Sequence, residues 1–144
     1  KIWQEIVGDT LANAAKIDLL GVPPDIIADF GAVSEETARQ MARGVKRISG
    51  SDYALSVTGI AGPSGGSKDK PVGTVCVGLS GPATLVSRKF QSPFSDRLYN
   101  KQIFAMVALD LLRKELVIDR TAKDDFGQDP DCRGNKRKNN GLEG

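Results

Sequence analysis

A loop crowded with glycine separates two apolar runs in the middle of the chain and limits the folds open to it. Residues 59–66 hold four glycines in eight positions, between the apolar runs 53–58 and 72–79. Because glycine has no side chain, the backbone N–H groups of such a loop can turn inward and form an anion-binding concavity. A flexible connection between two strands explains the same composition, since Gly and Pro mark turns generally. The loop lacks the spacings of a Walker motif and of a dinucleotide site.

The length and charge of the chain limit the classes of protein to which it can belong. Its 144 residues are 40% hydrophobic, which fits one domain with its own core. A net charge of +2 and the lack of a basic face argue against specific nucleic-acid binding. No apolar run approaches the ~18 residues of a membrane span, and no charged-then-apolar leader is present. We therefore expect a cytoplasmic domain with neither a nucleic acid nor a membrane as partner.

The chain contains no histidine, which restricts its chemistry. A Ser-His-Asp or Cys-His mechanism and an imidazole-ligated zinc site are excluded, so general acid or base work would fall to Lys, Tyr, Asp or Glu. Cys76 lies in an apolar run and Cys132 in a polar tail, a spacing that suggests neither a metal site nor a disulfide. We expect a reducing compartment, no metal and no cofactor.

Hydrophobic periodicity and turn residues predict a mixed α/β fold. A weak strand pattern covers residues 2–11, and helical patterns follow over 12–20, 24–30 and 34–48. Ser34 before Glu35 and Glu36 is typical of a helix start. Strand patterns cover 53–58, 72–79 and 83–90, the last two as a hairpin, and a long helix begins at residue 95 or 96. This order predicts a mixed sheet covered by helices.

The last part of the chain changes in composition. From about residue 121 it consists mainly of Lys, Asp, Asn, Gly and Arg, with few large apolar residues. We expect a domain over residues 1–117 and a disordered polar tail over 118–144, to which we assign no role.

Several motifs resemble the C-terminal domain of the CinA competence/damage-inducible family. They lie at residues 19–23, 31–36, 58–63, 65–66, 70–75 and 96–97, and the resemblance covers residues 3–116. It implies a three-layer α/β/α sandwich. Members of the family are nicotinamide-nucleotide amidases, which hydrolyse nicotinamide mononucleotide to nicotinic acid mononucleotide and ammonia. The resemblance thus implies an amidohydrolase whose small-molecule partner is that mononucleotide.

The resemblance carries over only part of the family's catalytic residues. The family's serine nucleophile, in a Thr-Ala-Glu-Ser-Cys-Thr-Gly-Gly segment, has no counterpart here, so we expect an N-terminally incomplete domain. The family's Tyr-Ser-Asn-Glu-Ala-Lys segment matches residues 11–16, where Asn13 and Lys16 are kept and Leu11 replaces the tyrosine. Lys16 is thereby implied as the catalytic base, since a desolvated lysine can activate a serine, and Asn13 as a substrate contact. Without the resemblance, Lys16 reads as a surface lysine on an amphipathic helix.

The resemblance also implies the residues that contact the nucleotide. Arg97 and Lys101, at the start of the last helix, are implied as phosphate or substrate contacts, although a capped, solvated helix start explains them equally well. Ser95 stands where the family has glycine, and Lys101 where it usually has arginine, so the bidentate fork is lost there. The implied contacts in the loop are Thr58, Gly59, Ile60, Gly62, Gly65 and Gly66.

Two hypotheses of function remain open. The first is an amidase of the nicotinamide-nucleotide type, inactive as given because the serine segment is absent. The second is a non-catalytic nucleotide-binding or structural module, which the replacement of the tyrosine by Leu11 favours. A missing first strand would leave an unpaired sheet edge and an uncovered apolar face. We therefore expect a marginally stable chain that associates with itself, with a homo-oligomer as one form.

Overall fold

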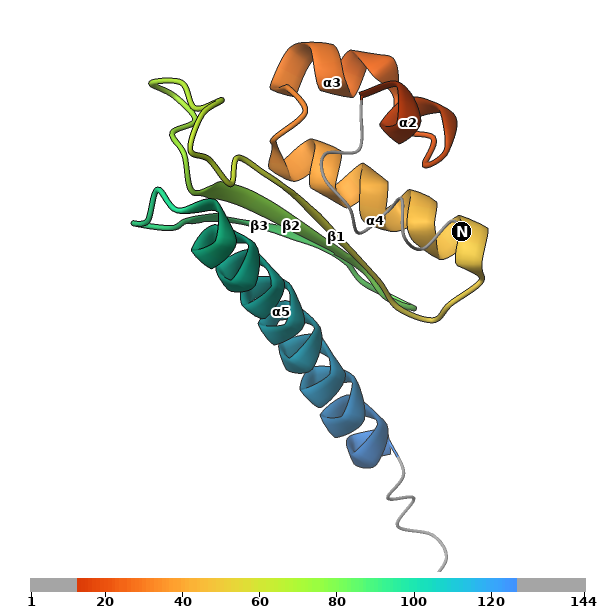
Figure 1. Ribbon diagram of the computed structural model, residues 1–144. Coiled ribbons are helices and arrows are strands. Elements are labelled where there is room, and N and C mark those ends of the chain that lie inside the picture. Colours follow the sequence, from red (N-terminus) through yellow and green to blue (C-terminus); the bar gives the residue numbers. More distant parts are fainter. Residues whose placement is uncertain (1–12, 127–144) are drawn as a thin grey trace, which may run out of the picture. The chain divides into compact units, whose positions relative to one another are not determined.

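The computed structural model describes residues 13–126 (Figure 1). The strand predicted over residues 2–11, as well as Leu11 and Cys132, lie outside the described residues. The elements, in chain order, are α2 (Asn13–Asp18), α3 (Pro24–Phe30), α4 (Glu35–Ser49), β1 (Ala54–Gly59), β2 (Thr74–Ser80), β3 (Leu85–Gln91) and α5 (Arg97–Phe126). Each described element matches one that the sequence predicts, and apart from the end of α5 the ends are shifted by at most a few residues.

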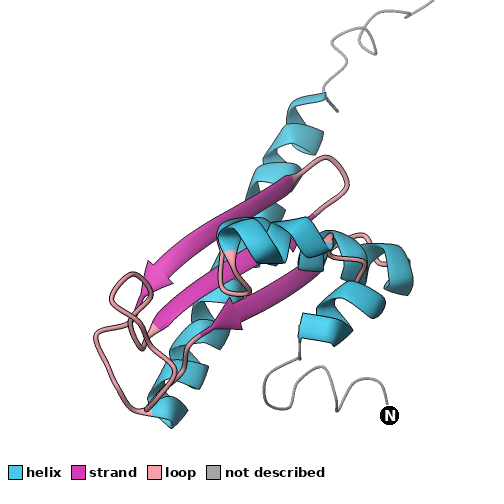
Figure 2. Ribbon diagram, turned by 90° about the horizontal axis from the view of Figure 1, so that it is seen from above, coloured by secondary structure: helices cyan, strands magenta, loops and turns pink. Residues whose placement is uncertain are grey.

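The three described strands form an antiparallel sheet in the order β1-β2-β3 (Figure 2). The predicted hairpin of β2 and β3 is confirmed, and Val77 pairs with Val57 on one side and with Arg88 on the other. We predicted a mixed sheet, but the described strands contain no parallel pair. The reason is the connections: each strand is joined to its neighbour by a loop, whereas parallel neighbours need a longer crossover.

Helices cover both faces of the sheet, which confirms the three-layer α/β/α arrangement. On one face, α4 lies so close to β2 that a Cβ at Gly78 would be 2.5 Å from the carbonyl carbon of Ala38. On the other face, Val75 and Val77 form a buried cluster with Phe104 and Ala108 of α5. Covered on both sides, β2 is buried along its whole length, as expected of a central strand.

The α2–α3 hairpin packs on the side of α4 that faces away from the sheet (Figure 1). Leu20 and Val22, in the link between α2 and α3, form a second buried cluster with Met41 of α4. Gly44 of α4 lies beneath this link, and a Cβ there would be 2.8 Å from the carbonyl carbon of Leu20. The apolar residues that predicted a helix over 34–48 thus pack against the sheet on one side and against the α2–α3 link on the other.

The ends of α4 follow the signals in the sequence. The Ser34 hydroxyl accepts a hydrogen bond from the Thr37 N–H at 3.1 Å, as the predicted cap requires. At the other end Gly50 adopts φ +66°, and its N–H donates to the Lys46 carbonyl at 3.0 Å. Local sequence therefore fixes where this helix begins and ends.

The chain divides into two compact units, the first ending at Arg113 and the second beginning at Lys114. The boundary predicted at residue 117 lies within α5, which continues to Phe126. Residues 118–126 are therefore helical where we expected a disordered tail, because no Gly or Pro interrupts the helix before residue 127. Among the described helices, none is both long enough and apolar enough to cross a membrane.

Candidate functional site

The glycine loop, residues 60–73, leaves the sheet between β1 and β2 and is closed at its base by two backbone hydrogen bonds. The Ile60 N–H donates to the Thr74 carbonyl at 2.8 Å, and the Gly73 N–H donates to the Ile60 carbonyl at 2.7 Å. Ile60, predicted as a nucleotide contact, therefore has its N–H occupied by the sheet. The part of the loop that remains for a ligand is the segment between these bonds.

Several glycines in this region are required by the protein's own packing. A Cβ at Gly59 would lie 2.8 Å from Cε2 of Phe104, and one at Gly66 would lie 2.7 Å from the N atom of Val72. Gly62, at φ +91°, packs against the Val72 side chain and precedes a cis peptide bond to Pro63. Val72 thus fills the inside of the bend, where the sequence predicted a concavity for a ligand.

The outer rim of the loop is open. Gly65 has φ +91°, and the nearest atom to a Cβ placed there is Cγ2 of Ile60 at 3.8 Å. The N–H groups of Ser64, Gly65 and Gly66 belong to exposed residues and donate to no acceptor within the described part of the chain. Such a run of unpaired amides is the feature that binds an anion. The rim, rather than the inside of the bend, is the candidate anion site.

Thr58 ties the sheet to the segment before α4, and its predicted contact with a ligand stays a prediction. Its side chain is buried, and its hydroxyl donates to the Ala32 carbonyl at 2.7 Å. The same stretch before α4 is held by Ser34 and Thr37, whose hydroxyls donate to the Gly31 carbonyl at 3.0 and 2.8 Å. The Thr58 hydroxyl thereby joins the sheet to the start of α4.

Cationic and amide side chains tie the loop to its neighbours. The Arg97 guanidinium, at the start of α5, donates to the Gly62 carbonyl at 3.3 Å, which places a positive charge beside the loop; a contact of Arg97 with phosphate stays a prediction. Lys101, one turn further along α5, is exposed. Lys70 reaches from within the loop to the Phe30 carbonyl at 2.6 Å. The loop is therefore held from α5 on one side and from the end of α3 on the other.

Asn100 is a structural residue of the site that our sequence analysis missed. It is fully buried, and its Nδ2 donates to the carbonyls of Ala61 at 2.8 Å and Phe94 at 3.0 Å. Its Oδ1 is buried without a hydrogen-bond partner in the described structure. The one hint in the sequence is spacing: Asn100 precedes Phe104 and Ala108 by four and eight residues, so it lies on the helix side that those two residues bury.

Lys16 is buried in α2 rather than exposed on the surface. Its side chain is 6% exposed, and its Nζ donates to Asn13 Oδ1 at 3.3 Å. Burial lowers the pKa of the Lys16 ammonium from its usual 10.5, because desolvation disfavours the charged form. The two residues that the resemblance implied for one site are thus in contact.

No hydrogen bond within residues 13–126 joins Lys16 to the glycine loop. The link after α2 packs on Gly44 and Arg47, late in α4, whereas the loop reaches residues 30 and 31, before α4 begins, through Lys70. In the described residues, Asn13 is the hydrogen-bond partner of the Lys16 ammonium, and no hydroxyl group takes that place. That Lys16 and the loop residues act on the same nucleotide, as the resemblance implies, therefore stays a prediction.

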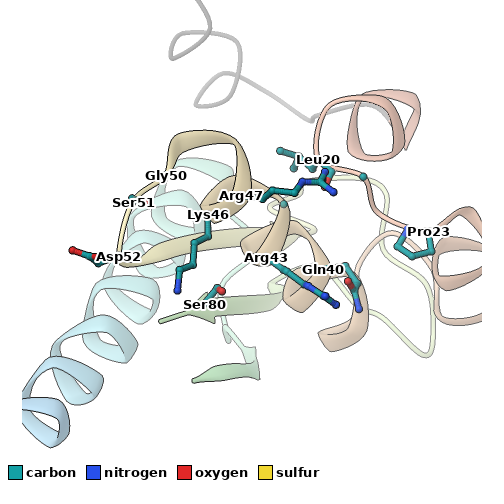
Figure 3. A pocket seen from close by; sticks show the side chains of 12 residues that line it. Leu20, Pro23, Gln40, Arg43, Lys46, Arg47, Gly50, Ser51, Asp52 and Ser80 are labelled. Carbon is teal, nitrogen blue, oxygen red and sulfur yellow. The ribbon is translucent and has the colours of Figure 1, made fainter. Parts of the chain in front are cut away.

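A basic hollow surrounds the later turns of α4, and none of the predicted site residues is among those that line it (Figure 3). The Lys46 Nζ donates to the Gly81 carbonyl, and the Arg47 Nη2 to the Leu20 carbonyl at 3.4 Å. These cations lie where the helix dipole is negative and bind neighbouring carbonyls. The hollow is lined by Leu20, Gly21, Pro23, Gln40, Arg43, Gly44, Lys46, Arg47, Gly50, Ser51, Asp52 and Ser80.

Cys76 lies within β2, and its thiol is buried. Burial, followed by the negative charge of Glu35, raises the pKa of this thiol, which makes it a poor nucleophile. Within the part of the chain that the structure describes, no three His, Cys, Asp or Glu side chains gather in a way that could hold a metal ion.

The family model and the curated relatives that match this chain agree on one family. The family model described as the CinA C-terminal domain matches residues 9–116. A CinA-like protein of Desulfosudis oleivorans is 52% identical over 110 residues, which are 76% of this chain and 27% of the relative. A CinA-like protein of Geobacter metallireducens is 50% identical over 108 residues, 75% of this chain and 26% of the relative. The chain thus spans about a quarter of the length of these curated relatives.

Solved structures agree with this result. The competence/damage inducible protein CihA from Agrobacterium tumefaciens matches with a TM-score of 0.70 and 38% identity, covering 73% of this chain and 64% of that one. The competence damage-inducible protein A from Klebsiella pneumoniae matches with a TM-score of 0.70 and 29% identity, covering 75% and 66%.

Proposed function

Since this chain belongs to the CinA C-terminal domain family, we propose that it is a nicotinamide-nucleotide amidase domain that binds the phosphate of nicotinamide mononucleotide at its glycine loop. The reaction of such a domain replaces the carboxamide of the nucleotide by a carboxylate and releases ammonia, with water as the second reactant. The proposal covers two separate properties, binding of the nucleotide and hydrolysis of its amide.

The open rim of the glycine loop is the observation that carries the binding proposal. Exposed amides at Ser64, Gly65 and Gly66 have no acceptor among the described residues, and Arg97 is held beside the loop by the Gly62 carbonyl. Backbone N–H groups together with a guanidinium suit the three acceptor oxygens of a phosphate monoester. Because the loop is closed at its base and fastened by Asn100, these donors are positioned before the ligand arrives.

The state of Lys16 supports the catalytic part of the proposal. A lowered pKa increases the neutral fraction of the amine, and a neutral amine can accept the proton of a serine hydroxyl. The serine oxygen would then add to the carboxamide carbon and expel ammonia, and water would cleave the resulting ester. Lys16 hydrogen-bonds to Asn13 and to no hydroxyl of the described residues. We therefore propose that the 144-residue chain binds the nucleotide without turning it over.

The test measures binding and hydrolysis separately. Ammonia release from nicotinamide mononucleotide is assayed with the 144-residue chain and with a version that carries an added Thr-Ala-Glu-Ser-Cys-Thr-Gly-Gly segment. Ammonia release by the extended version alone supports an amidase ancestry. Lys16→Met in that version should then abolish the release of ammonia. Calorimetric titration should show binding to both versions, and activity of the chain as it stands would refute the proposed inactivity.

A matched pair of variants locates the binding site. Ser64→Asp and Ser64→Asn differ in charge but hardly in size, so Ser64→Asp should weaken binding of the mononucleotide by at least about tenfold, while Ser64→Asn should not. Nicotinamide riboside, which lacks the phosphate, should bind more weakly than the mononucleotide and respond equally to both variants. Equal effects of the two variants on mononucleotide binding would refute a phosphate site at this rim.

The second candidate is a non-catalytic module. It is favoured by Leu11, which stands where the family has a tyrosine, and by the lack of a hydroxyl partner for Lys16 in the described residues. Absence of mononucleotide binding by either version in the calorimeter would establish a purely structural module in place of the amidase domain.

A further inference from the structure

The end of the glycine loop, where the chain returns to β2, is fastened to the end of β3 by the side chain of Gln91. Its Nε2 donates to the Val72 carbonyl at 2.8 Å and to the Ser92 carbonyl at 3.1 Å. Its Oε1 accepts a hydrogen bond from the Thr74 hydroxyl at 2.7 Å. Thr74, the first residue of β2, is fully buried and pairs with Gln91 across the sheet. The Gln91 amide therefore joins the loop to both strands of the hairpin.

A glutamine amide suits this position because its two ends do opposite things. The two hydrogens of Nε2 meet carbonyl oxygens, which can only accept, whereas Oε1 meets a hydroxyl, which can donate. A carboxylate could donate to neither carbonyl, and an ammonium could not accept from the hydroxyl. The backbone follows the same course, since the Gly73 carbonyl accepts from the Ser92 N–H at 2.9 Å. Every polar atom of the Gln91 amide is thus matched to a partner.

Val72, whose carbonyl Gln91 holds, fills the inside of the bend. Its Cγ1 is the atom nearest to a Cβ placed at Gly62, and its N and Cγ2 lie 2.7 and 3.1 Å from a Cβ placed at Gly66. Gly62 precedes the open rim of the loop, and Gly66 ends it. Because both glycines pack against Val72, a shift of Val72 changes the spacing of the rim amides between them.

The beginning of the loop is held by a different element. Asn100 and Arg97 of α5 donate to the carbonyls of Ala61 and Gly62, and neither of these contacts involves Gln91. Loss of the Gln91 hydrogen bonds should therefore loosen the end of the loop while its beginning and the sheet stay in place.

We propose that Gln91 is a positioning residue of the candidate anion site: its amide holds Val72 in the bend, and Val72 fixes the spacing of the rim amides. The inference rests on the proposed binding of the mononucleotide through its phosphate. Gln91 acts through Val72 and does not touch the ligand. A rim of fixed spacing has its donors aligned before the phosphate arrives, so affinity for the phosphate falls when that spacing varies.

Calorimetric titrations with nicotinamide mononucleotide and with nicotinamide riboside measure how much the phosphate adds to affinity. Gln91→Met keeps an unbranched, uncharged side chain but removes all three hydrogen bonds, so the ratio of mononucleotide to riboside affinity should fall about fivefold to tenfold. Gln102→Met, at an exposed position of α5, is the matched control and should leave the ratio unchanged. A general loss of stability does not move this ratio, because both ligands bind the same folded state. Circular dichroism verifies that each variant is folded.

Amide signals in NMR spectra of the labelled chain locate the effect. In the unaltered chain the mononucleotide should shift the signals of residues 64–66, and in Gln91→Met these shifts should be smaller. The Ile60 amide, which donates to the Thr74 carbonyl, should keep its position in the variant. A moved Ile60 signal would mean that the substitution acts on the sheet as a whole, which overturns the proposal.

The titrations separate this inference from the proposed function. If the unaltered chain prefers the mononucleotide and Gln91→Met keeps that preference, or both methionine variants lower it equally, Gln91 has no positioning role and the phosphate site stands. If the unaltered chain binds the two ligands equally or binds neither, the phosphate site itself is refuted, and the role of Gln91 falls with it.

Discussion

The substitution Gly44→Ala sets two physical effects against each other within one helix. Gly44 lies in the interior of α4, where replacing glycine by alanine normally stabilises a helix by about 0.8–1 kcal/mol. In this structure, however, the α2–α3 link crosses the helix at that position. An added Cβ would lie 2.8 Å from the carbonyl carbon and 3.0 Å from the Cα of Leu20, against a usual contact of about 3.5–4.0 Å.

The packing cost should exceed the gain in helix propensity. The obstructing atoms belong to backbone, which cannot rotate out of the way, so the link must move by about 1 Å. Leu20 and Val22 would then leave their positions in the cluster with Met41. Overpacking of this kind typically costs about 1–3 kcal/mol, and three backbone atoms of Leu20 within 3.0 Å of the added Cβ put Gly44→Ala in the upper half of that range. We therefore expect a net loss of about 1–2 kcal/mol, or a fall in Tm of about 5–10 °C for a domain of this size.

Urea unfolding followed by circular dichroism measures the effect. The midpoint should fall while the slope of the transition stays unchanged, since the same surface is exposed. Arg43→Ala, at the preceding exposed position of α4, is the control and should change stability by less than about 0.5 kcal/mol. If Gly44→Ala were as stable as the unaltered chain or more stable, the close approach of Leu20 to α4 would be wrong.

Two further substitutions test the buried polar groups of the candidate site. Lys16→Met should stabilise the 144-residue chain at neutral pH, because it removes a buried ammonium whose folded-state pKa lies below the unfolded value of 10.5. Each pKa unit by which folding lowers the pKa of Lys16 corresponds to about 1.4 kcal/mol of lost stability. Below the lowered pKa this cost is fully present, and it disappears as the pH rises toward 10.5, so the advantage of the variant should shrink over that range. An advantage independent of pH in urea titrations would contradict the explanation. Asn100→Ala should destabilise the chain by about 1–3 kcal/mol, since it removes a buried amide that donates to the Ala61 and Phe94 carbonyls. A loss no larger than that of the exposed Gln102→Ala control, measured by thermal unfolding, would argue against this role.

Most of the described secondary structure was predictable because its signals are local. Ser34, with Glu35 and Glu36, marks the start of α4 through groups that lie within one turn of each other. Alternation and turn residues likewise predicted the hairpin of β2 and β3. Where local signals failed was the end of α5, because a polar composition suggested disorder in a segment that contains no helix-breaking residue before position 127.

The sequence predicted the positions of the candidate site residues but not the contacts that these residues make in the folded chain. The glycines of residues 59–66 suggested an open concavity, but Val72 fills the bend and leaves the outer rim as the open part. Thr58, implied as a ligand contact, instead donates to Ala32, which is 26 residues away in the sequence. Asn100 was missed altogether, since its two acceptors at Ala61 and Phe94 come together only in the folded chain.

The sequence by itself determined which segments are helices and strands, where α4 begins and ends, and to which family the motifs point, because these depend on neighbouring residues. Only the tertiary structure decided which glycines serve packing, which amides of the glycine loop stay open, and that Lys16 is buried. Those properties arise from contacts between segments far apart in the chain, and no local pattern of residues encodes such contacts.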